Sequence, residues 1–148
     1  MSSYTQLYYH IIFAPKFREP VLLNPHRQRL YAYLWQVLVN KKCQPYAING
    51  VEDHLHIFTH IHQSLAIASL IKDLKLSSSD MIKRERLFPK FGGWQAGYAA
   101  FTVEHAGKEE VFKYVRNQEV HHRDEVYIEE LKRLLRQAGV SFEERYLE

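Results

Sequence analysis

The sequence predicts an α+β fold in which helices cover one face of a four-stranded antiparallel sheet and extra helices follow at the C-terminus. Residues 4–13 alternate side chains in the manner of a half-buried strand. Asn49-Gly50 joins two further strand-like runs, and this dipeptide is a hairpin-turn signal. Stretches with helical apolar spacing precede and follow the hairpin. The resulting order, β-α-β-β-α-β, is the ferredoxin-like or RRM-like split β-α-β arrangement.

The first half of the chain supplies a strand, a helix and a hairpin. After the strand at 4–13, Asn24 is expected to cap a helix whose first position is Pro25, a pairing favoured at helix starts. The helix carries an apolar stripe that we expect to face the sheet, consisting of Leu30, Leu34, Val37 and Leu38. Residues 44–50 then form the second strand, and residues 51–62 form the third.

The second half adds a helix and a strand before it ends in helices. Ser64 is expected to cap a helix that reaches about Arg84, and the serines at 77–79 predict a kink or break in its middle. Residues 94–103 are expected to form the fourth strand. A third helix over 108–122 and a final helix over 124–137 follow, and Gly139 is placed to terminate the last one.

The composition predicts one domain, residues 1–148, with enough apolar material for a core. Hydrophobic residues make up 46% of the chain, and the net charge of +3 permits a nucleic-acid partner without requiring one. The single cysteine, Cys43, excludes an internal disulfide and suits a reducing compartment. No signal-peptide pattern opens the chain, and no apolar run approaches the roughly 20 residues of a membrane span. We therefore expect a soluble, cytoplasmic protein with no membrane partner.

The third strand contains a pair of histidines, in Asp53-His54-Leu55-His56-Ile57-Phe58. Because they are two residues apart on a strand, His54 and His56 point to the same face, about 6.6 Å apart along the chain. Two imidazoles so placed can hold a divalent metal, although an isolated pair is more often structural or solvated. The adjacent Asp53 can support one ligand through a hydrogen bond. His60 and His62 continue the same face, where we expect solvated side chains at the strand end.

A tyrosine and a glutamine lie one turn apart on the expected third helix, in Tyr114-Val115-Arg116-Asn117-Gln118. The helix should pack on the sheet through Val111, Phe112 and Val115, with Tyr114, Gln118 and His121 together on the flank of that stripe. A tyrosine in this position is usually a packing residue. Arg116 and His121 flank the tyrosine and are further candidates for the site.

A metal nearby would change the chemistry of this tyrosine. A phenol with a pKa of about 10 is a poor nucleophile at neutral pH, whereas a divalent cation stabilises the phenolate and polarises a phosphate. A metal on two imidazoles still needs a third protein ligand. The side-chain oxygen of Gln118 suits a hard cation such as Mg²⁺ or Mn²⁺.

Four blocks of sequence resemble the single-tyrosine (Y1) transposases of the IS200/IS605 insertion-sequence family, which belong to the HUH nuclease superfamily. The blocks are Ile48-Asn49-Gly50-Val51-Glu52-Asp53-His54-Leu55-His56, Ile71-Lys72-Asp73-Leu74-Lys75-Leu76-Ser77-Ser78, Trp94-Gln95-Ala96-Gly97-Tyr98-Ala99-Ala100-Phe101 and Tyr114-Val115-Arg116-Asn117-Gln118-Glu119-Val120-His121-His122. The resemblance covers the chain from Tyr4 to its end. Leu76 departs from it, since relatives often carry glycine there.

The resemblance implies a role for each of these residues. His54 and His56 would be metal ligands, Tyr114 the nucleophile and Gln118 the third ligand. It implies an enzyme that cuts and rejoins single-stranded DNA through a 5′-phosphotyrosine, with Mg²⁺ or Mn²⁺ as cofactor. It further implies a homodimer in which the tyrosine of one subunit can complete the active site of the other. The expected substrates are hairpins at the ends of a mobile element, and the expected location is the nucleoid in the cytoplasm of a prokaryote.

Two other interpretations stay open from the residues alone. A non-enzymatic RRM-like module would bind nucleic acid on exposed sheet aromatics and would need no metal. A metal-dependent hydrolase would use water and would need a carboxylate base near the histidine pair, from which Asp53 is expected to point away by strand parity. A domesticated transposase acting on genomic repeats is a variant of the transposase interpretation.

Overall fold

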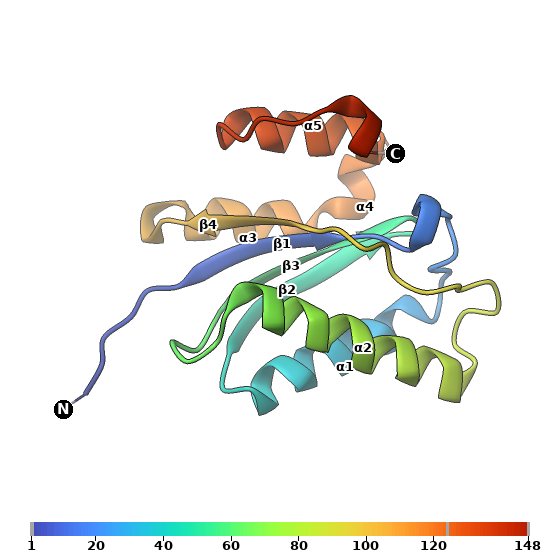
Figure 1. The fold of residues 1–148 in the computed structure, drawn as a ribbon, viewed down its shortest axis with the longest axis horizontal. Helices are drawn as coiled ribbons and strands as arrows, with labels where there is room; N and C mark the ends of the chain where they lie inside the picture. The colour runs from blue at the N-terminus through green and yellow to red at the C-terminus, as the bar shows by residue number, and fades with distance from the viewer. Residues whose placement is uncertain (1, 124, 148) are drawn as a thin grey trace.

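Four antiparallel strands form a central sheet in the order β2-β3-β1-β4 (Figure 1). The structure is a computed structural model and describes residues 2–123 and 125–147. The strands are β1 (Tyr8–Phe13), β2 (Gln44–Val51), β3 (His54–His60) and β4 (Ala99–Val103). Strands β1 and β3 are the inner pair, with Ile11 opposite Ile57 and Ile12 opposite His56. This is the strand order of the ferredoxin-like arrangement, so the predicted fold class is confirmed.

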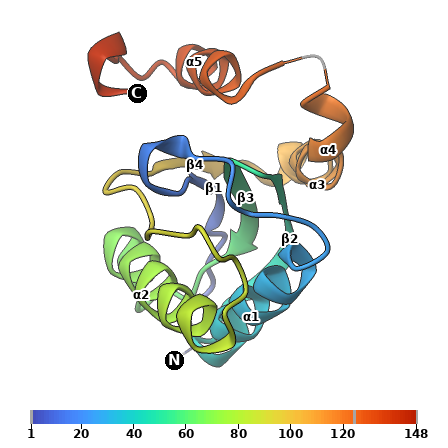
Figure 2. The same ribbon diagram turned by 90° about the vertical axis from the view of Figure 1, so that its right-hand side faces the viewer.

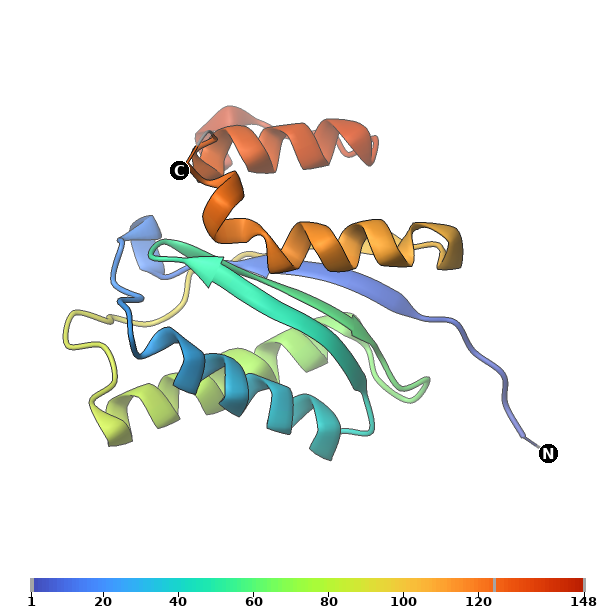
Figure 3. The same cartoon turned by 180° about the vertical axis from the view of Figure 1, so that it is seen from behind.

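Helices cover both faces of this sheet (Figures 2 and 3). On one face lie α1 (Arg27–Asn40) and α2 (Ile67–Glu85), and on the other lie α3 (Lys108–Arg116), α4 (Gln118–His121) and α5 (Tyr127–Gln137). Short 3-10 turns occur at Lys16–Arg18, His105–Gly107 and Glu144–Tyr146. The extra C-terminal helices therefore close over the sheet face opposite the first two helices. None of the described helices is both long and apolar enough to cross a membrane.

Strand β3 is buried on both faces, and its alternation divides core from site. Leu55 and Ile57 belong to the main hydrophobic cluster with the stripes of α1 and α2, whereas Phe58 packs with Val115 of α3 on the other side. His54 and His56 share the parity of Phe58 and are both 0% exposed. The prediction that they share one face of a strand is confirmed, and that face is covered by the C-terminal helices.

Several element ends differ from the sequence prediction. Strand β1 begins at Tyr8 and β4 at Ala99, while Trp94 makes only an isolated bridge to Pro15. Helix α1 begins at Arg27, two residues after Pro25, so Asn24 does not cap it. Helix α2 begins at Ile67, and Ser64 bonds the ring of His62 instead of capping this helix. The predicted start of the last helix at Asp124 lies outside the described residues, and the helix described there begins at Tyr127.

The serines at 77–79 do not break α2, contrary to the prediction. Ser78 donates to the carbonyl of Leu74 at 2.6 Å and accepts from the buried indole of Trp94 at 2.9 Å. Ser77 likewise donates to the carbonyl of Asp73 at 2.8 Å. Their hydroxyls thus bond within the helix and to the core, which leaves the backbone ladder intact.

The third predicted helix is instead divided at Asn117, into α3 and α4. The backbone of Asn117 departs from helical geometry at φ −99° and ψ 19°. At the same point the Asn49 side chain donates to the carbonyl of Arg116 at 2.8 Å. A bond from β2 thus satisfies a carbonyl at the end of α3, which allows the chain to turn over the histidine strand.

The hairpin that presents the histidines depends on Gly50. A Cβ at this position would lie 2.3 Å from the carbonyl oxygen of His54 and 2.8 Å from the Cα of Leu55, both backbone atoms. We expect Gly50→Ala to lower the free energy of unfolding by about 2–3 kcal/mol, because the two strands must separate to accept it. Denaturant titration measures this. Gly97→Ala, where nothing lies within 4 Å of the added carbon, is the matched control, and equal effects of both changes would contradict the prediction.

Candidate metal centre and tyrosine site

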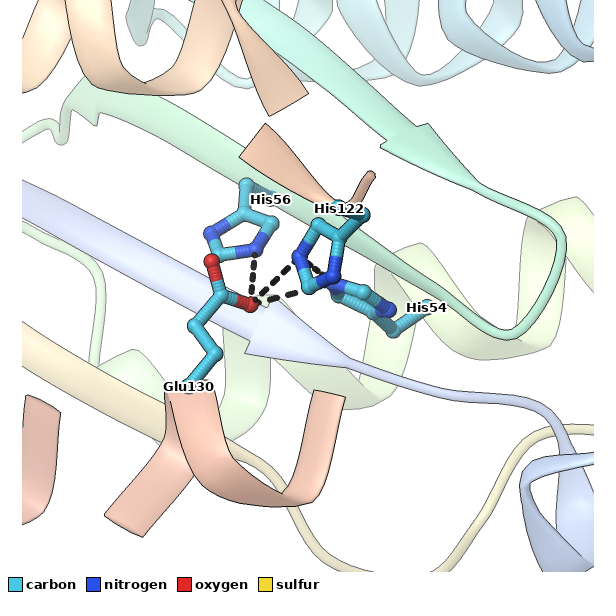
Figure 4. Close-up of side chains that lie close together, drawn as sticks. All are labelled: His54, His56, His122 and Glu130. Carbon is cyan, nitrogen blue, oxygen red and sulfur yellow. Dashed lines mark hydrogen bonds and ion pairs between the residues drawn. The ribbon is translucent and has the colours of Figure 1, made fainter. Parts of the chain in front are cut away.

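Three imidazoles and one carboxylate converge over strand β3 (Figure 4). The Oε1 atom of Glu130, on α5, lies 3.1 Å from the Nε2 atoms of His54 and His56 and 3.0 Å from that of His122. The Nε2 atoms of His54 and His122 are themselves 3.0 Å apart. All four donor atoms lie within 4.8 Å of one another, which is close enough to share one ion. Imidazole nitrogen and carboxylate oxygen are common metal ligands, so these residues fit a divalent cation.

Hydrogen bonds at the Nδ1 atoms orient the rings of the two strand histidines. Asp53 accepts from Nδ1 of His54 at 2.7 Å, and the Nδ1 atom of His56 lies 2.7 Å from Nε2 of His10. Both contacts leave the Nε2 atoms directed at Glu130. Partners of this kind fix the orientation of metal-binding histidines.

Burial keeps part of the cluster uncharged. It lowers the pKa of His56 to about 4, and burial together with the neighbouring His56 lowers the pKa of His10 to about 3. Both rings are therefore neutral at pH 7, and the neutral ring is the form that binds a metal. For His54, hydrogen bonds to Asp53 and Glu130 outweigh burial and raise the pKa.

Tyr114 lies beside the cluster in the same chain. Its hydroxyl donates to Oε2 of Glu130 and accepts from Nη2 of Arg133, at 2.8 Å in the second case. Its ring centroid is 5.9 Å from that of His56. Burial and the bond to the Glu130 carboxylate raise the pKa of Tyr114, and Arg133 opposes that shift. The phenol is therefore protonated at neutral pH in the metal-free protein.

Gln118 is fully buried one turn after Tyr114. Its amide nitrogen lies 3.4 Å from the carbonyl of Tyr114, and its side-chain oxygen has no hydrogen-bond partner within the described residues. An unpaired buried oxygen is costly. The free oxygen is therefore available to a ligand.

The further candidates Asp53, Arg116 and His121 separate into two groups. Asp53 and His121 lie at the site, the latter with its ring centroid 5.2 Å from that of Tyr114 and its Nε2 2.6 Å from Oε1 of Glu125. Arg116 does not lie there: its side chain is exposed, with the guanidinium over the ring of Phe112. Arg116 follows Tyr114 by two residues, a rotation of about 200° around the helix axis, so its side chain leaves the tyrosine side of α3.

Two expectations attached to the alternatives also change. Strand parity predicted that Asp53 points away from the histidine pair. Strand β3 begins only at His54, so this parity does not apply to Asp53, and its carboxylate accepts a hydrogen bond from the His54 ring. The sheet face that an RRM-like module would keep open is covered by α3 to α5 (Figure 2). A carboxylate beside the histidines, which a hydrolase requires, is present in Glu130.

The sequence analysis does not single out Glu130, Arg133 or His10, and it names His122 only as the last residue of the fourth block of the resemblance. The spacing of Glu130 and Arg133 places them on one side of a helix, but it is shared by many solvated pairs. What distinguishes Glu130 is its burial at 0% exposure. That burial arises because α5 folds back across the sheet, which no local pattern indicates.

Comparison with known proteins identifies relatives of the chain. The family described as "Transposase IS200 like" matches residues 3–118. The ISDra2 transposase TnpA of Deinococcus radiodurans is 25% identical over 118 residues, covering 76% of this chain and 84% of the relative.

Two solved structures share the fold. One, from Deinococcus radiodurans and described as a transposase, aligns with a TM-score of 0.61 at 24% identity over 80% of this chain and 95% of that one. The other, a REP-associated tyrosine transposase bound to a REP hairpin, aligns with a TM-score of 0.61 at 15% identity over 82% of this chain and 74% of that one. At these identities, the two structures support the fold.

Proposed function

Because the chain belongs to the IS200-like transposase family, with a tyrosine of the Y1 type, we propose that it cuts and rejoins single-stranded DNA with Tyr114 as nucleophile. One observation carries the proposal: a single carboxylate, Glu130, contacts both the Tyr114 hydroxyl and the Nε2 atoms of His54 and His56. The contact of Tyr114 and of both histidines with one side chain of the same chain supports the proposal.

The first step is a transesterification. The Oη atom of Tyr114 attacks the scissile phosphorus, a bond forms between them, and the bond from phosphorus to the 3′ oxygen breaks. The products are a 5′-phosphotyrosine and a DNA end with a free 3′-OH, which takes up the proton. In the second step, a 3′-OH from another DNA end attacks the phosphotyrosine and releases the phenol. No ATP is consumed, because the phosphotyrosine conserves the phosphodiester bond energy.

The side chains around Tyr114 favour this reaction in distinct ways. Arg133 donates to Oη, so it stabilises negative charge on the phenolate. Glu130 Oε2 is the acceptor to which the hydroxyl proton already points. Asp53 and His10 hold the rings of His54 and His56.

A divalent cation, Mg²⁺ or Mn²⁺, would be held by His54 and His56, with the buried oxygen of Gln118 as a third ligand. When bound it supplies Lewis-acid stabilisation of charge on the phosphate.

The proposed substrate is a hairpin at the end of a mobile element or, in a domesticated copy, at a genomic repeat. A related transposase has been solved with a REP hairpin, which supports this choice. The exposed basic side chains and the net charge of +3 are compatible with DNA. A homodimer completed in trans is part of the family pattern, but the position of Tyr114 beside its own chain's histidines supports an arrangement in cis.

A covalent-trapping assay tests the function. Purified protein is mixed with single-stranded DNA from the flanks of its own gene and Mg²⁺ or Mn²⁺, then separated on a denaturing gel. We expect a metal-dependent protein–DNA adduct, which peptide mass spectrometry locates on Tyr114. Binding that is independent of metal and gives no cleavage would instead favour a non-enzymatic nucleic-acid-binding module.

A further inference from the structure

Two of the four converging donors come from a part of the chain that the family match does not include. The match ends at residue 118, whereas His122 and Glu130 follow it. Glu130 reaches the histidines from α5, and Figure 4 shows its carboxylate aimed at all three rings. The C-terminal segment therefore does more than cover the sheet.

The spacing of the donor atoms is that of a coordination shell. Ligand atoms about 2.0–2.2 Å from an ion at tetrahedral angles lie about 3.4 Å from one another. Here the three Nε2 atoms lie 3.0–3.1 Å from Oε1 of Glu130. A small outward shift of these side chains would admit one ion between them.

The hydrogen bonding also leaves Nε2 of His54 directed at this point. A carboxylate only accepts, so the bond from His54 to Asp53 places a ring hydrogen on Nδ1. The Nε2 atom of the same ring lies 3.1 Å from Oε1 of Glu130. Coordination of an ion through Nε2 therefore keeps the bond to Asp53, as is usual for metal-binding histidines.

The surroundings of Glu130 support the same conclusion. Its side chain is 0% exposed, and within the described residues its ion-pair partners are all histidines, namely His54, His56, His121 and His122. Burying a carboxylate is costly unless it is paired or binds a metal. A divalent ion at the centre of the cluster would neutralise it.

We propose that Glu130 and His122 join His54 and His56 as ligands of one divalent ion, and that this site prefers a transition metal such as Mn²⁺, Co²⁺ or Zn²⁺ to Mg²⁺. Three imidazoles and a carboxylate are a donor set for such ions, whereas Mg²⁺ prefers oxygen ligands and bound water. The inference rests on the proposed metal site at His54 and His56. It takes the remaining ligands from α5 and from the residue that follows α4, in place of Gln118, and it selects the class of metal.

Metal binding to untagged protein, without DNA, tests the proposal. Isothermal titration with MnCl₂, CoCl₂, ZnCl₂ and MgCl₂ should give one site per chain and the weakest binding for Mg²⁺. The visible absorption of the Co²⁺ form should show the intense bands of four-coordinate cobalt. This readout needs no variant, so it is independent of any folding defect.

Substitution of Glu130 identifies the ligand. We expect Glu130→Gln, which keeps the side-chain size, to weaken binding by about 10–100-fold and to change the Co²⁺ spectrum. His122→Gln should act in the same direction. The matched control is Glu129→Gln, on the neighbouring exposed position of α5, which should bind the metal as wild type does. Circular dichroism establishes that each variant is folded.

Several results would overturn the inference: equal metal affinity of Glu130→Gln and wild type, preference for Mg²⁺, or absence of binding. Unchanged metal affinity with faster DNA cleavage in Glu130→Gln would also overturn it, since Glu130 would then obstruct the site. The proposed function is tested separately. Glu130-dependent metal binding without a DNA adduct would refute the function alone, and an adduct with Glu130-independent binding would refute the inference alone.

Discussion

Replacement of Tyr114 by phenylalanine is expected to abolish the covalent protein–DNA adduct, a fall of at least about 10³-fold in its rate of formation. The change removes only the hydroxyl, which contacts Glu130 and Arg133. The aromatic ring still packs against the rings of His56 and His121. The variant should therefore stay folded and bind metal, so that loss of the adduct reports on the nucleophile itself. Denaturing gels of wild type and variant with labelled single-stranded DNA measure the difference.

A matched tyrosine controls for the loss of a phenol elsewhere. Tyr33 lies on α1, across the sheet from the site, and packs against the main core. Tyr33→Phe should give the adduct at the wild-type rate. If Tyr114→Phe still cleaves DNA, the reaction uses water, and Glu130 is then the carboxylate base that a metal-dependent hydrolase requires.

The second large effect is expected from His56→Gln. His56 is fully buried, with its Nε2 3.1 Å from Oε1 of Glu130 in the donor cluster, and its ring is neutral at pH 7 because burial lowers its pKa to about 4. Without this ring the charge stabilisation of the metal, worth several kcal/mol, is lost. At about 1.36 kcal/mol for each tenfold change in rate, adduct formation should slow by about 10²–10³-fold. Initial rates at fixed metal concentration measure it.

The same strand offers the control for this variant. His60 has the same parity on β3 but lies outside the donor cluster, with its Nε2 3.4 Å from the carbonyl of Thr5. His60→Gln should leave the rate of adduct formation near that of wild type. An equal loss in both variants would indicate that the strand had been disturbed, and an unaffected His56→Gln would exclude this ring as a metal ligand.

Much of the fold follows from local pattern. Strand alternation and the stripe of Leu30, Leu34 and Leu38 predict the split β-α-β core, which the structure confirms. The predicted turn at Asn49-Gly50 is wrong in position: both residues pair with β3 inside β2, and the hairpin turns at Glu52 and Asp53. Element ends were predicted less well, because they depend on contacts from elsewhere in the chain. Within α2 the Ser78 hydroxyl bonds the Leu74 carbonyl and accepts from Trp94, and the bond from Asn49 lies where α3 ends.

The site divides in the same way. The shared face of His54 and His56 is a property of a strand with a repeat of two residues, so the sequence determined it. The positions of His122, Glu130 and Arg133 depend on how α4 and α5 turn back over that face. This packing is decided by the burial of Tyr127 and Leu131 against the sheet, a long-range contact between elements. The sequence therefore determined the strand that carries the histidine pair, whereas only the tertiary structure decided which side chains surround it.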